Sequence, residues 1–153
     1  MTLVVLVGLP ASGKSKWAGE QRLPVLSSDE MRRIITGDIT NQTVNSLVFR
    51  MLRRVLDAML AAGVERVIVD STALTRRERR TWIRWAELNG CGVEAVFFDT
   101  PREVCEKRNR ERERVVPADA MERLFNRFEP PRLEEGFDRL TIIAAPATTT
   151  ERG

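Results

Sequence analysis

The sequence predicts an α/β fold in which helices cover both faces of a parallel sheet of four to five strands. Short apolar runs alternate with helix-forming stretches along the chain; the runs are 3–7, 24–26, 67–69, 93–98 and 140–144. Continuous apolar runs of this length are typical of strands buried on both faces. A chain of 153 residues is long enough for one domain with its own core. We expect this domain to span residues 1–145 and residues 146–153 to form a flexible tail.

The first apolar run leads into the octapeptide Gly8-Leu9-Pro10-Ala11-Ser12-Gly13-Lys14-Ser15, which fits the P-loop pattern G-x-x-x-x-G-K-[ST]. A helix is expected over 16–21, which gives the motif the strand, turn and helix start that it requires. In such a loop the backbone N–H groups surround phosphate, the lysine reaches the β/γ-phosphates and the serine hydroxyl ligates Mg²⁺. The sequence therefore predicts an ATP site, with Ser15 as the metal ligand. Its expected residues are Gly8, Pro10, Ala11, Ser12, Gly13, Lys14 and Ser15.

Helix-start and helix-stop signals place the later elements. Ser28 is the expected N-cap of a helix that ends near Gly37, and a longer amphipathic helix is expected over 43–62. Thr75 and Thr100 each begin a T-x-x-E capping box before a further helix. A last helix is expected to open at Pro117 and to end near residue 128.

The composition excludes several kinds of chemistry. The chain has no histidine, so a histidine base, a Ser-His-Asp triad and histidine metal ligands are all excluded. Any protein group that accepts a proton must therefore be a carboxylate. All but three of the cationic residues are arginines. Arginine suits bidentate phosphate recognition. The alternative is that the arginine content only reflects a GC-rich genome. The net charge of +3 predicts no broad basic surface.

The chain carries no signal for a membrane or for export. No stretch approaches the ~20 apolar residues of a membrane span, and no basic region precedes the apolar run 3–7. We therefore expect a cytoplasmic protein without membrane contact. Cys91 and Cys105 lack C-x-x-C spacing and are expected to be reduced thiols. No protein partner can be predicted from the sequence.

Polar side chains follow the second and third predicted strands, as the P-loop follows the first. Because ligands bind at the carboxyl ends of parallel strands, the three segments should meet at one cleft. Asp29 then becomes the expected general base for an acceptor hydroxyl. Arg32 lies on the same side of the helix and could hold an acceptor phosphate. Alternatively, Asp29 only favours the helix dipole and Arg32 is a surface charge.

Asp70 ends the third strand and has two possible roles in the site. It could be a partner of Mg²⁺, as the aspartate after this strand is in P-loop proteins, or it could contact the acceptor. Thr72 is a second candidate for the acceptor contact. The alternative is that Asp70 only caps the following turn.

The arginine-rich stretch 108–114 follows the fourth strand and its helix. If the stretch is helical, Arg108 and Arg112 share a face. Lids that close over ATP and bring arginines to the phosphates are common in kinases. We therefore predict an Arg-rich lid with Arg108 and Arg112 as catalytic cations; the alternative is a solvated helix with Glu–Arg pairs.

Together these segments resemble the 5′-hydroxyl polynucleotide kinase domain of phage and bacterial end-healing enzymes. The resemblance rests on segments 13–18, 28–32, 67–74, 79–82, 96–99, 107–109 and 116–117, and covers residues 3–128. It implies a P-loop kinase fold with Lys14 and Asp29 as catalytic residues. It also implies that Arg32 contacts the acceptor phosphate and that Arg108 and Arg112 are the lid arginines. The lid is about one residue shorter than in the phage protein, and without a D-x-D-x-T motif no 3′-phosphatase activity is expected.

The function expected from these observations is transfer of the γ-phosphate of ATP, or another NTP, to a 5′-OH end of DNA or RNA. Two alternatives stay open: a kinase of a nucleoside, sugar or antibiotic, and a nucleotide-binding module without transfer activity. Arg32 favours an acceptor that bears a phosphate, and Asp29 argues against a module that only binds nucleotide. The sequence does not distinguish DNA from RNA.

Overall fold

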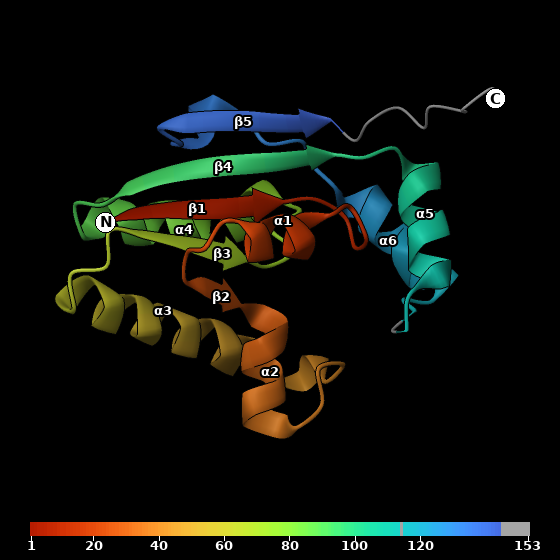
Figure 1. The fold of residues 1–153 in the computed structure, drawn as a ribbon, viewed down its shortest axis with the longest axis horizontal. Coiled ribbons are helices and arrows are strands. Elements are labelled where there is room, and N and C mark those ends of the chain that lie inside the picture. The colour runs from red at the N-terminus through yellow and green to blue at the C-terminus, as the bar shows by residue number, and fades with distance from the viewer. Residues whose placement is uncertain (114, 145–153) are drawn as a thin grey trace.

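A five-stranded parallel sheet with helices on both faces forms the centre of the computed structural model, which describes residues 1–113 and 115–144 (Figure 1). Its strands are β1 (Thr2–Val7), β2 (Val25–Ser27), β3 (Arg66–Asp70), β4 (Gly92–Asp99) and β5 (Arg139–Ala144). They lie in the order β2-β3-β1-β4-β5. The predicted α/β fold is therefore confirmed. Arg114 and the expected tail 146–153 lie outside the described residues.

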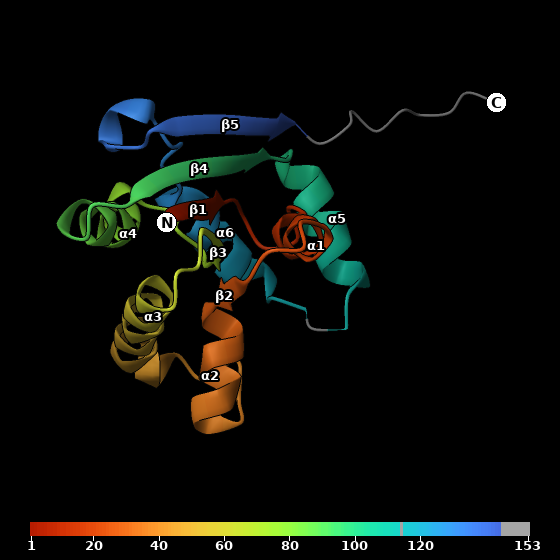
Figure 2. The same cartoon turned by 60° about the vertical axis from the view of Figure 1, so that its left-hand side comes forward.

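Six α-helices lie between and beyond these strands in the described residues: α1 (Lys14–Glu20), α2 (Ser28–Thr36), α3 (Asn45–Ala61), α4 (Arg76–Leu88), α5 (Arg102–Glu111) and α6 (Ala118–Arg127). Two short 3₁₀ turns, η1 (Gln42–Val44) and η2 (Leu133–Glu135), complete the described elements. Helices α1 and α5 lie on one side of the sheet, and α3 and α4 lie on the other (Figure 2). No helix of the described part of the chain is long and apolar enough to cross a lipid bilayer.

The side chains of β1 alternate between two hydrophobic cores. Leu3, Val5 and Val7 belong to the core under α3 and α4, which also contains the fully buried Trp82. Val4 and Leu6 point to the other face, where they join Ala18 of α1 and residues of β3 and β4. The central strand is therefore buried on both faces, as the apolar run predicted.

Each of the three predicted helix caps differs from the structure in some way. Helix α2 begins at Ser28, so its N-cap is Ser27, whose hydroxyl accepts a hydrogen bond from the Glu30 N–H at 3.1 Å. The prediction of Ser28 was wrong by one residue because two serines are adjacent. Thr75 does cap α4, but the Glu78 carboxylate accepts from the Leu74 N–H at 2.9 Å rather than from the N-cap.

The capping box predicted at Thr100 is wrong for a different reason. The Thr100 hydroxyl donates to the carbonyl of Ser12 at 2.9 Å, far away in the sequence. Pro101 is the N-cap of α5 and makes no side-chain cap. Helix α5 also ends at Glu111, and Arg112 has extended backbone angles, so Arg108 and Arg112 do not share a helical face.

A buried ion pair holds the segment after α6 against α4. Arg79 is fully buried, and its guanidinium donates to the two carboxylate oxygens of Glu135 at 2.9 and 3.2 Å. A further nitrogen of Arg79 donates to the carbonyl of Ala73 at 2.9 Å, in the loop that follows β3. This one side chain therefore links η2, α4 and an edge of the cleft.

We expect Glu135→Ala to lower the free energy of unfolding by about 3–5 kcal/mol, because it leaves the Arg79 guanidinium buried without a counterion. Glu134→Ala is the matched control, because Glu134 is adjacent but exposed and should change stability by less than about 0.5 kcal/mol. Urea unfolding followed by circular dichroism measures both variants. Equal stabilities would show that the ion pair contributes nothing to the fold.

Candidate active site

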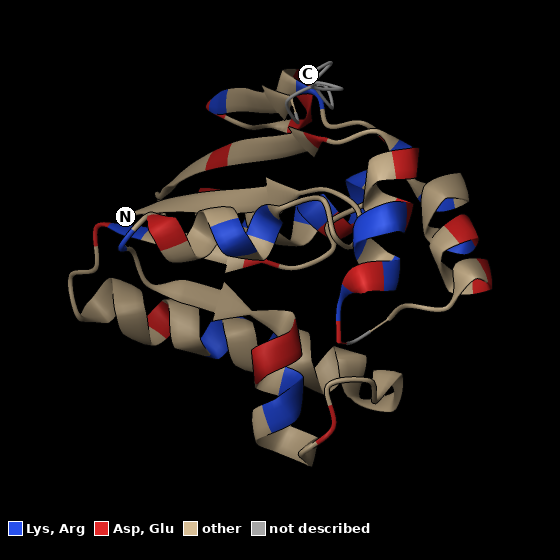
Figure 3. Ribbon diagram, turned by 45° about the vertical axis from the view of Figure 1, so that its right-hand side comes forward, with Lys and Arg blue, Asp and Glu red and all other residues tan. Residues whose placement is uncertain are grey.

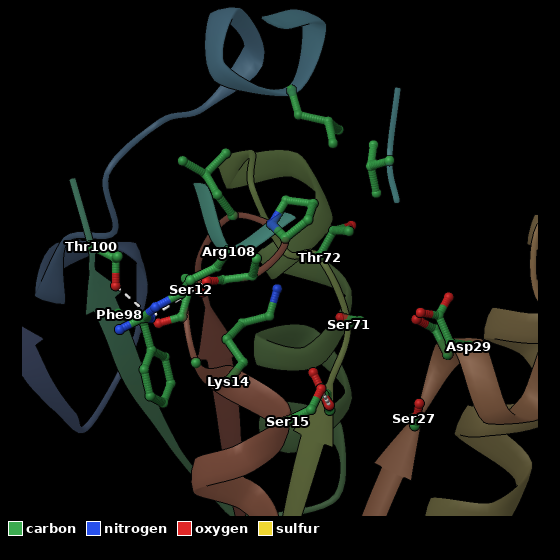
Figure 4. Close-up of a pocket in the computed structure, with 18 of the residues that line it drawn as sticks. Ser12, Lys14, Ser15, Ser27, Asp29, Ser71, Thr72, Phe98, Thr100 and Arg108 are labelled. Carbon is green, nitrogen blue, oxygen red and sulfur yellow. Dashed lines mark hydrogen bonds between the residues drawn. The ribbon is translucent and has the colours of Figure 1, made fainter. Parts of the chain in front are cut away.

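The carboxyl ends of the strands open onto a cleft of about 1470 Å³. Every residue predicted for the site, except Gly8, lines this cleft: Pro10, Ala11, Ser12, Gly13, Lys14, Ser15, Asp29, Arg32, Asp70, Thr72, Arg108 and Arg112. Lys14, Ser71, Thr72 and Asp29 lie around one open space in Figure 4. The structure thus brings together residues from the loops after β1, β2 and β3 with residues of the predicted lid.

The P-loop needs glycine at its first and last turns. A Cβ added to Gly8 would lie 2.6 Å from the hydroxyl of Ser12 and 3.2 Å from the Cβ of Phe98, so no side chain fits there. Gly13 has a φ of 105°, which disfavours any residue with a Cβ. Ala11 has a φ of 63°, an uncommon conformation for a residue other than glycine. The loop is therefore held in a conformation that its surroundings must support.

Two contacts from outside the loop support it. Thr100, buried at the end of β4, donates to the Ser12 carbonyl as described above. Arg108 of α5 reaches across the loop, and its Nη1 lies 3.5 Å from the carbonyl oxygen of Ala11. Sequence reasoning missed the role of Thr100, because the local T-x-x-E pattern offered a plausible use for the same hydroxyl.

Lys14 is the principal cation of the loop. Its ammonium group donates to the carbonyl of Gly8 at 2.7 Å and points into the cleft (Figure 4). Burial lowers the pKa of Lys14, and the carboxylates of Asp70 and Asp29 act against that shift. A phosphate group in the cleft would likewise favour the charged form of Lys14.

Ser15 and Asp70 bring two side-chain oxygens together in the cleft. The Ser15 hydroxyl donates to an Asp70 carboxylate oxygen at 2.8 Å. A hydroxyl and a carboxylate are hard donors of the kind that Mg²⁺ prefers, and Mg²⁺ usually takes its remaining ligands from water and from substrate phosphates. The described residues contain no cluster of three or more acidic, cysteine or histidine side chains that could hold a metal by themselves. The pair therefore fits a metal ion that is bound together with a nucleotide.

Asp29 and Arg32 form the wall of the cleft at the end of β2. The carboxylate of Asp29 is 56% exposed, whereas the side chain of Arg32 is 5% exposed. Arg32 donates through Nη1 to Asp29 at 2.8 Å and through Nη2 to the Asn45 side chain at 2.7 Å. The Nε of Arg32 is buried without a hydrogen-bond partner in the described part of the chain. The predicted pair does lie together, and Arg32 also fixes the position of the Asp29 carboxylate.

Asn45, at the start of α3, is a site residue that sequence reasoning missed. Its amide accepts from Arg32 and donates to the side chain of Gln42 at 3.0 Å. Nothing local in the sequence marks it, because the contact joins two helices. The periodic apolar residues of α3 indicated only which face of the helix is buried.

Asn109 joins the two ends of the segment that the sequence predicts as a lid. The Asn109 side chain donates to the Val116 carbonyl at 2.7 Å and accepts from the Val116 N–H at 2.9 Å. This pair of hydrogen bonds mimics a backbone ladder and joins the end of α5 to the segment before α6. Helices α5 and α1 both carry basic and acidic residues (Figure 3). Arg108 and Arg112 both line the cleft although only Arg108 is helical.

The sequence profile of the AAA domain matches residues 3–131. The chain belongs to this family. Its fold matches that of P-loop kinases of known structure.

Among curated proteins, the bifunctional polynucleotide phosphatase/kinase of Schizosaccharomyces pombe is 25% identical over 146 residues. That match covers 92% of this chain and 33% of the yeast protein, so the chain spans about a third of its relative. A solved sugar kinase from Janibacter sp. HTCC2649 superposes with a TM-score of 0.67 at 24% identity, covering 94% of this chain and 85% of that one.

A chain in the Pnkp1/Rnl/Hen1 RNA repair complex also superposes with a TM-score of 0.67, at 22% identity. The superposition covers 82% of this chain and 43% of that chain. At these identities the two structures show a common fold and leave the acceptor open.

We expect Asn109→Ala to speed hydrogen exchange at the Val116 amide by at least an order of magnitude, because this N–H loses its acceptor and the local opening becomes easier. Asn126→Ala is the control, because Asn126 is an exposed asparagine of α6. Exchange measured by NMR on the intact chain tests the pair. Unchanged protection at Val116 would mean that Asn109 does not hold α5 to the segment before α6.

Proposed function

We propose that this chain transfers the γ-phosphate of ATP to a 5′-OH end of DNA or RNA. The observation that carries the proposal is the Asp29–Arg32 pair, which lines the same cleft as Lys14. Transfer to a hydroxyl needs a base on the acceptor side and cations on the donor side. In a chain without histidine, Asp29 can act as that base, because its carboxylate lies at the carboxyl ends of the strands and lines the cleft.

Each group has a distinct task in this proposal. The P-loop backbone and Lys14 hold the phosphates of ATP. Arg32 keeps the Asp29 carboxylate directed at the acceptor hydroxyl, from which Asp29 accepts the proton as the new bond to phosphorus forms. Arg108 and Arg112 stabilise the charge that spreads over the transferring group. The loop conformation fixed by Thr100 and Gly8 keeps the donor in line with that hydroxyl.

Ser15 and Asp70 are the residues that would hold Mg²⁺. When bound, the ion would neutralise charge on the phosphates of ATP. The hydrogen bond between the two side chains keeps both oxygens together at the floor of the cleft before any ligand arrives. The fit rests on this donor pair.

Support for a polynucleotide acceptor comes from two sources. The first is a buried arginine beside the base, which a neutral metabolite does not require. The second is the similarity to a polynucleotide phosphatase/kinase over 92% of the chain. The second candidate function is a small-molecule kinase. It is favoured by the fold of a sugar kinase, which is as similar as that of the RNA repair chain. It is also favoured by the hydrogen bonds that Arg32 already makes to Asp29 and Asn45.

We expect Asp29→Asn to lower kcat by about 10²–10⁴-fold, because asparagine keeps an oxygen for Arg32 but cannot accept the proton. The affinity for ATP should change by less than about threefold, because Asp29 lies on the acceptor side. Glu30→Gln is the control, since the neighbouring Glu30 is exposed and pairs with Arg33. Steady-state kinetics and calorimetry on the same samples separate the two quantities. If affinity and turnover fall together, Asp29 is not the base.

We expect the wild-type protein to phosphorylate a nucleoside 3′-monophosphate or a 5′-OH oligonucleotide about 10- to 150-fold better than the bare nucleoside, as judged by kcat/KM. This range corresponds to one charge-assisted hydrogen bond to the acceptor phosphate. Arg32→Ala should lower kcat with every acceptor, because Asp29 loses its support. It should also reduce the ratio between the two acceptors to near one.

Arg33→Ala is the matched control for that experiment, because Arg33 is the exposed neighbour of Arg32 and pairs with Glu30. Its ratio between acceptors should equal that of the wild type. Equal use of nucleoside and nucleotide by the wild type would reject the polynucleotide proposal and favour the small-molecule kinase.

A further inference from the structure

A second, smaller cavity of about 220 Å³ lies between α3 and α4. It is lined by Phe49, Ser71, Ala73, Arg77, Glu78, Thr81 and Trp82. Phe49, Ser71 and Glu78 also line the main cleft, so the two cavities are adjacent. None of the functions proposed above uses this smaller cavity. They involve the P-loop, Asp29, Arg32 and the predicted lid.

The smaller cavity is on the acceptor side of the cleft. Ser71 follows β3, and Asp29 follows β2, which pairs directly with β3. The ATP loop follows β1, and its supports Thr100 and Arg108 come from beyond β4, on the opposite side of β1. A group that enters the smaller cavity therefore belongs to the acceptor and not to the nucleotide donor.

The cavity is adjacent to the Arg32 site through helix α3. Asn45, which holds Arg32, and Phe49 are four residues apart on this helix and so lie one above the other on one face. A ligand whose phosphate lies against Arg32 would therefore have its next substituent near the Phe49 ring. In a nucleotide, the 3′-phosphate and the base are both attached to the same ribose.

The walls of the cavity suit a flat heteroaromatic ring. The Phe49 ring is half-buried, and its centroid lies 5.8 Å from that of Trp82, which fixes its orientation. Arg77 is exposed at the edge of the cavity and forms no ion pair within the described residues. Aromatic rings and arginine guanidinium planes are the surfaces on which unpaired bases stack.

The cavity also contains an unused polar group. The side chain of Ser71 is buried at 4% relative exposure, and its hydroxyl has no hydrogen-bond partner in the described part of the chain. Buried hydroxyl groups are normally paired, because leaving one unpaired costs free energy. A ligand ring with nitrogen or oxygen atoms on its edge would supply the missing partner, whereas an aliphatic group would not.

We propose that this cavity, with Phe49 and Arg77 on its walls and Ser71 at its base, binds the base of the 5′-terminal nucleotide of the acceptor strand. The volume is below the roughly 300–1,000 Å³ of a pocket for a whole drug-sized ligand, so one ring is the part of the acceptor that it suits. The proposal rests on the proposed function and specifies the substrate further: the first residue of the strand must carry a base.

The test uses two oligonucleotides with the same 5′-OH and the same first phosphate. One carries a base on its 5′-terminal residue, and the other has a tetrahydrofuran abasic residue there. For the wild-type protein we expect KM to be about 5- to 150-fold lower for the strand with the base, the range of one stacked base. The kcat values should be similar, because the cavity does not contact the reacting atoms.

Phe49→Ala should raise KM for the strand with the base to the abasic value and leave the abasic KM unchanged. Because Phe49 packs against Trp82, a second variant is needed: Thr81→Leu narrows the cavity from α4 and should have the same selective effect. Leu47→Ala is the control on α3, since Leu47 lines neither cavity and should leave both KM values unchanged.

Four results decide between the base site and its alternatives. Selective loss in both variants supports the base site. Equal KM values for the two strands in the wild type would overturn it and leave the proposed kinase activity standing. If both variants keep the wild-type preference for the strand with the base, the base does not bind in this cavity. Phosphorylation of neither strand would reject the proposed function, and the base site with it.

Discussion

Parallel pairing of β1 with both β3 and β4 is the constraint on which the rest of the structure depends. Its register matches Val5 with Val69 and Val7 with Phe97, so the three strands end at the same edge of the sheet. The turns that follow them are the P-loop, the loop after Asp70 and the turn at Thr100. A shift of one residue in either pairing would reverse which side chains face each core. The hydrophobic pattern of the strands therefore also fixes which polar groups meet at the cleft.

The charged groups at the cleft already have partners within the protein. Lys14 donates to a loop carbonyl, Ser15 to Asp70, and Arg32 to Asp29 and Asn45. These groups were oriented, and partly removed from water, when the chain folded. A ligand with phosphate groups therefore exchanges one set of partners for another and does not have to order the side chains. Such preorganisation is the main source of electrostatic catalysis in enzymes.

The sequence could predict the part of the site that depends on local sequence patterns. The P-loop, Asp29 with Arg32, and Asp70 at a strand end each depend on neighbours within a few residues, and all line the cleft. Thr100 and Asn45 were missed because their roles arise from contacts between elements distant in the chain. Thr100 is the instructive case: a local capping pattern and a contact with Ser12 compete for one hydroxyl, and the sheet brings Ser12 within reach.

The buried Arg79–Glu135 pair has a consequence for the limits of the folding unit. The family profile ends at residue 131, after α6 and before Glu135. A fragment that ended at residue 131 would keep the P-loop and Asp29. It would leave the Arg79 guanidinium buried without its counterion. It would also lose strand β5 and the Asp138 carboxylate that accepts from the Val93 N–H at 2.8 Å. The region that the family profile matches therefore leaves out contacts that stabilise this fold.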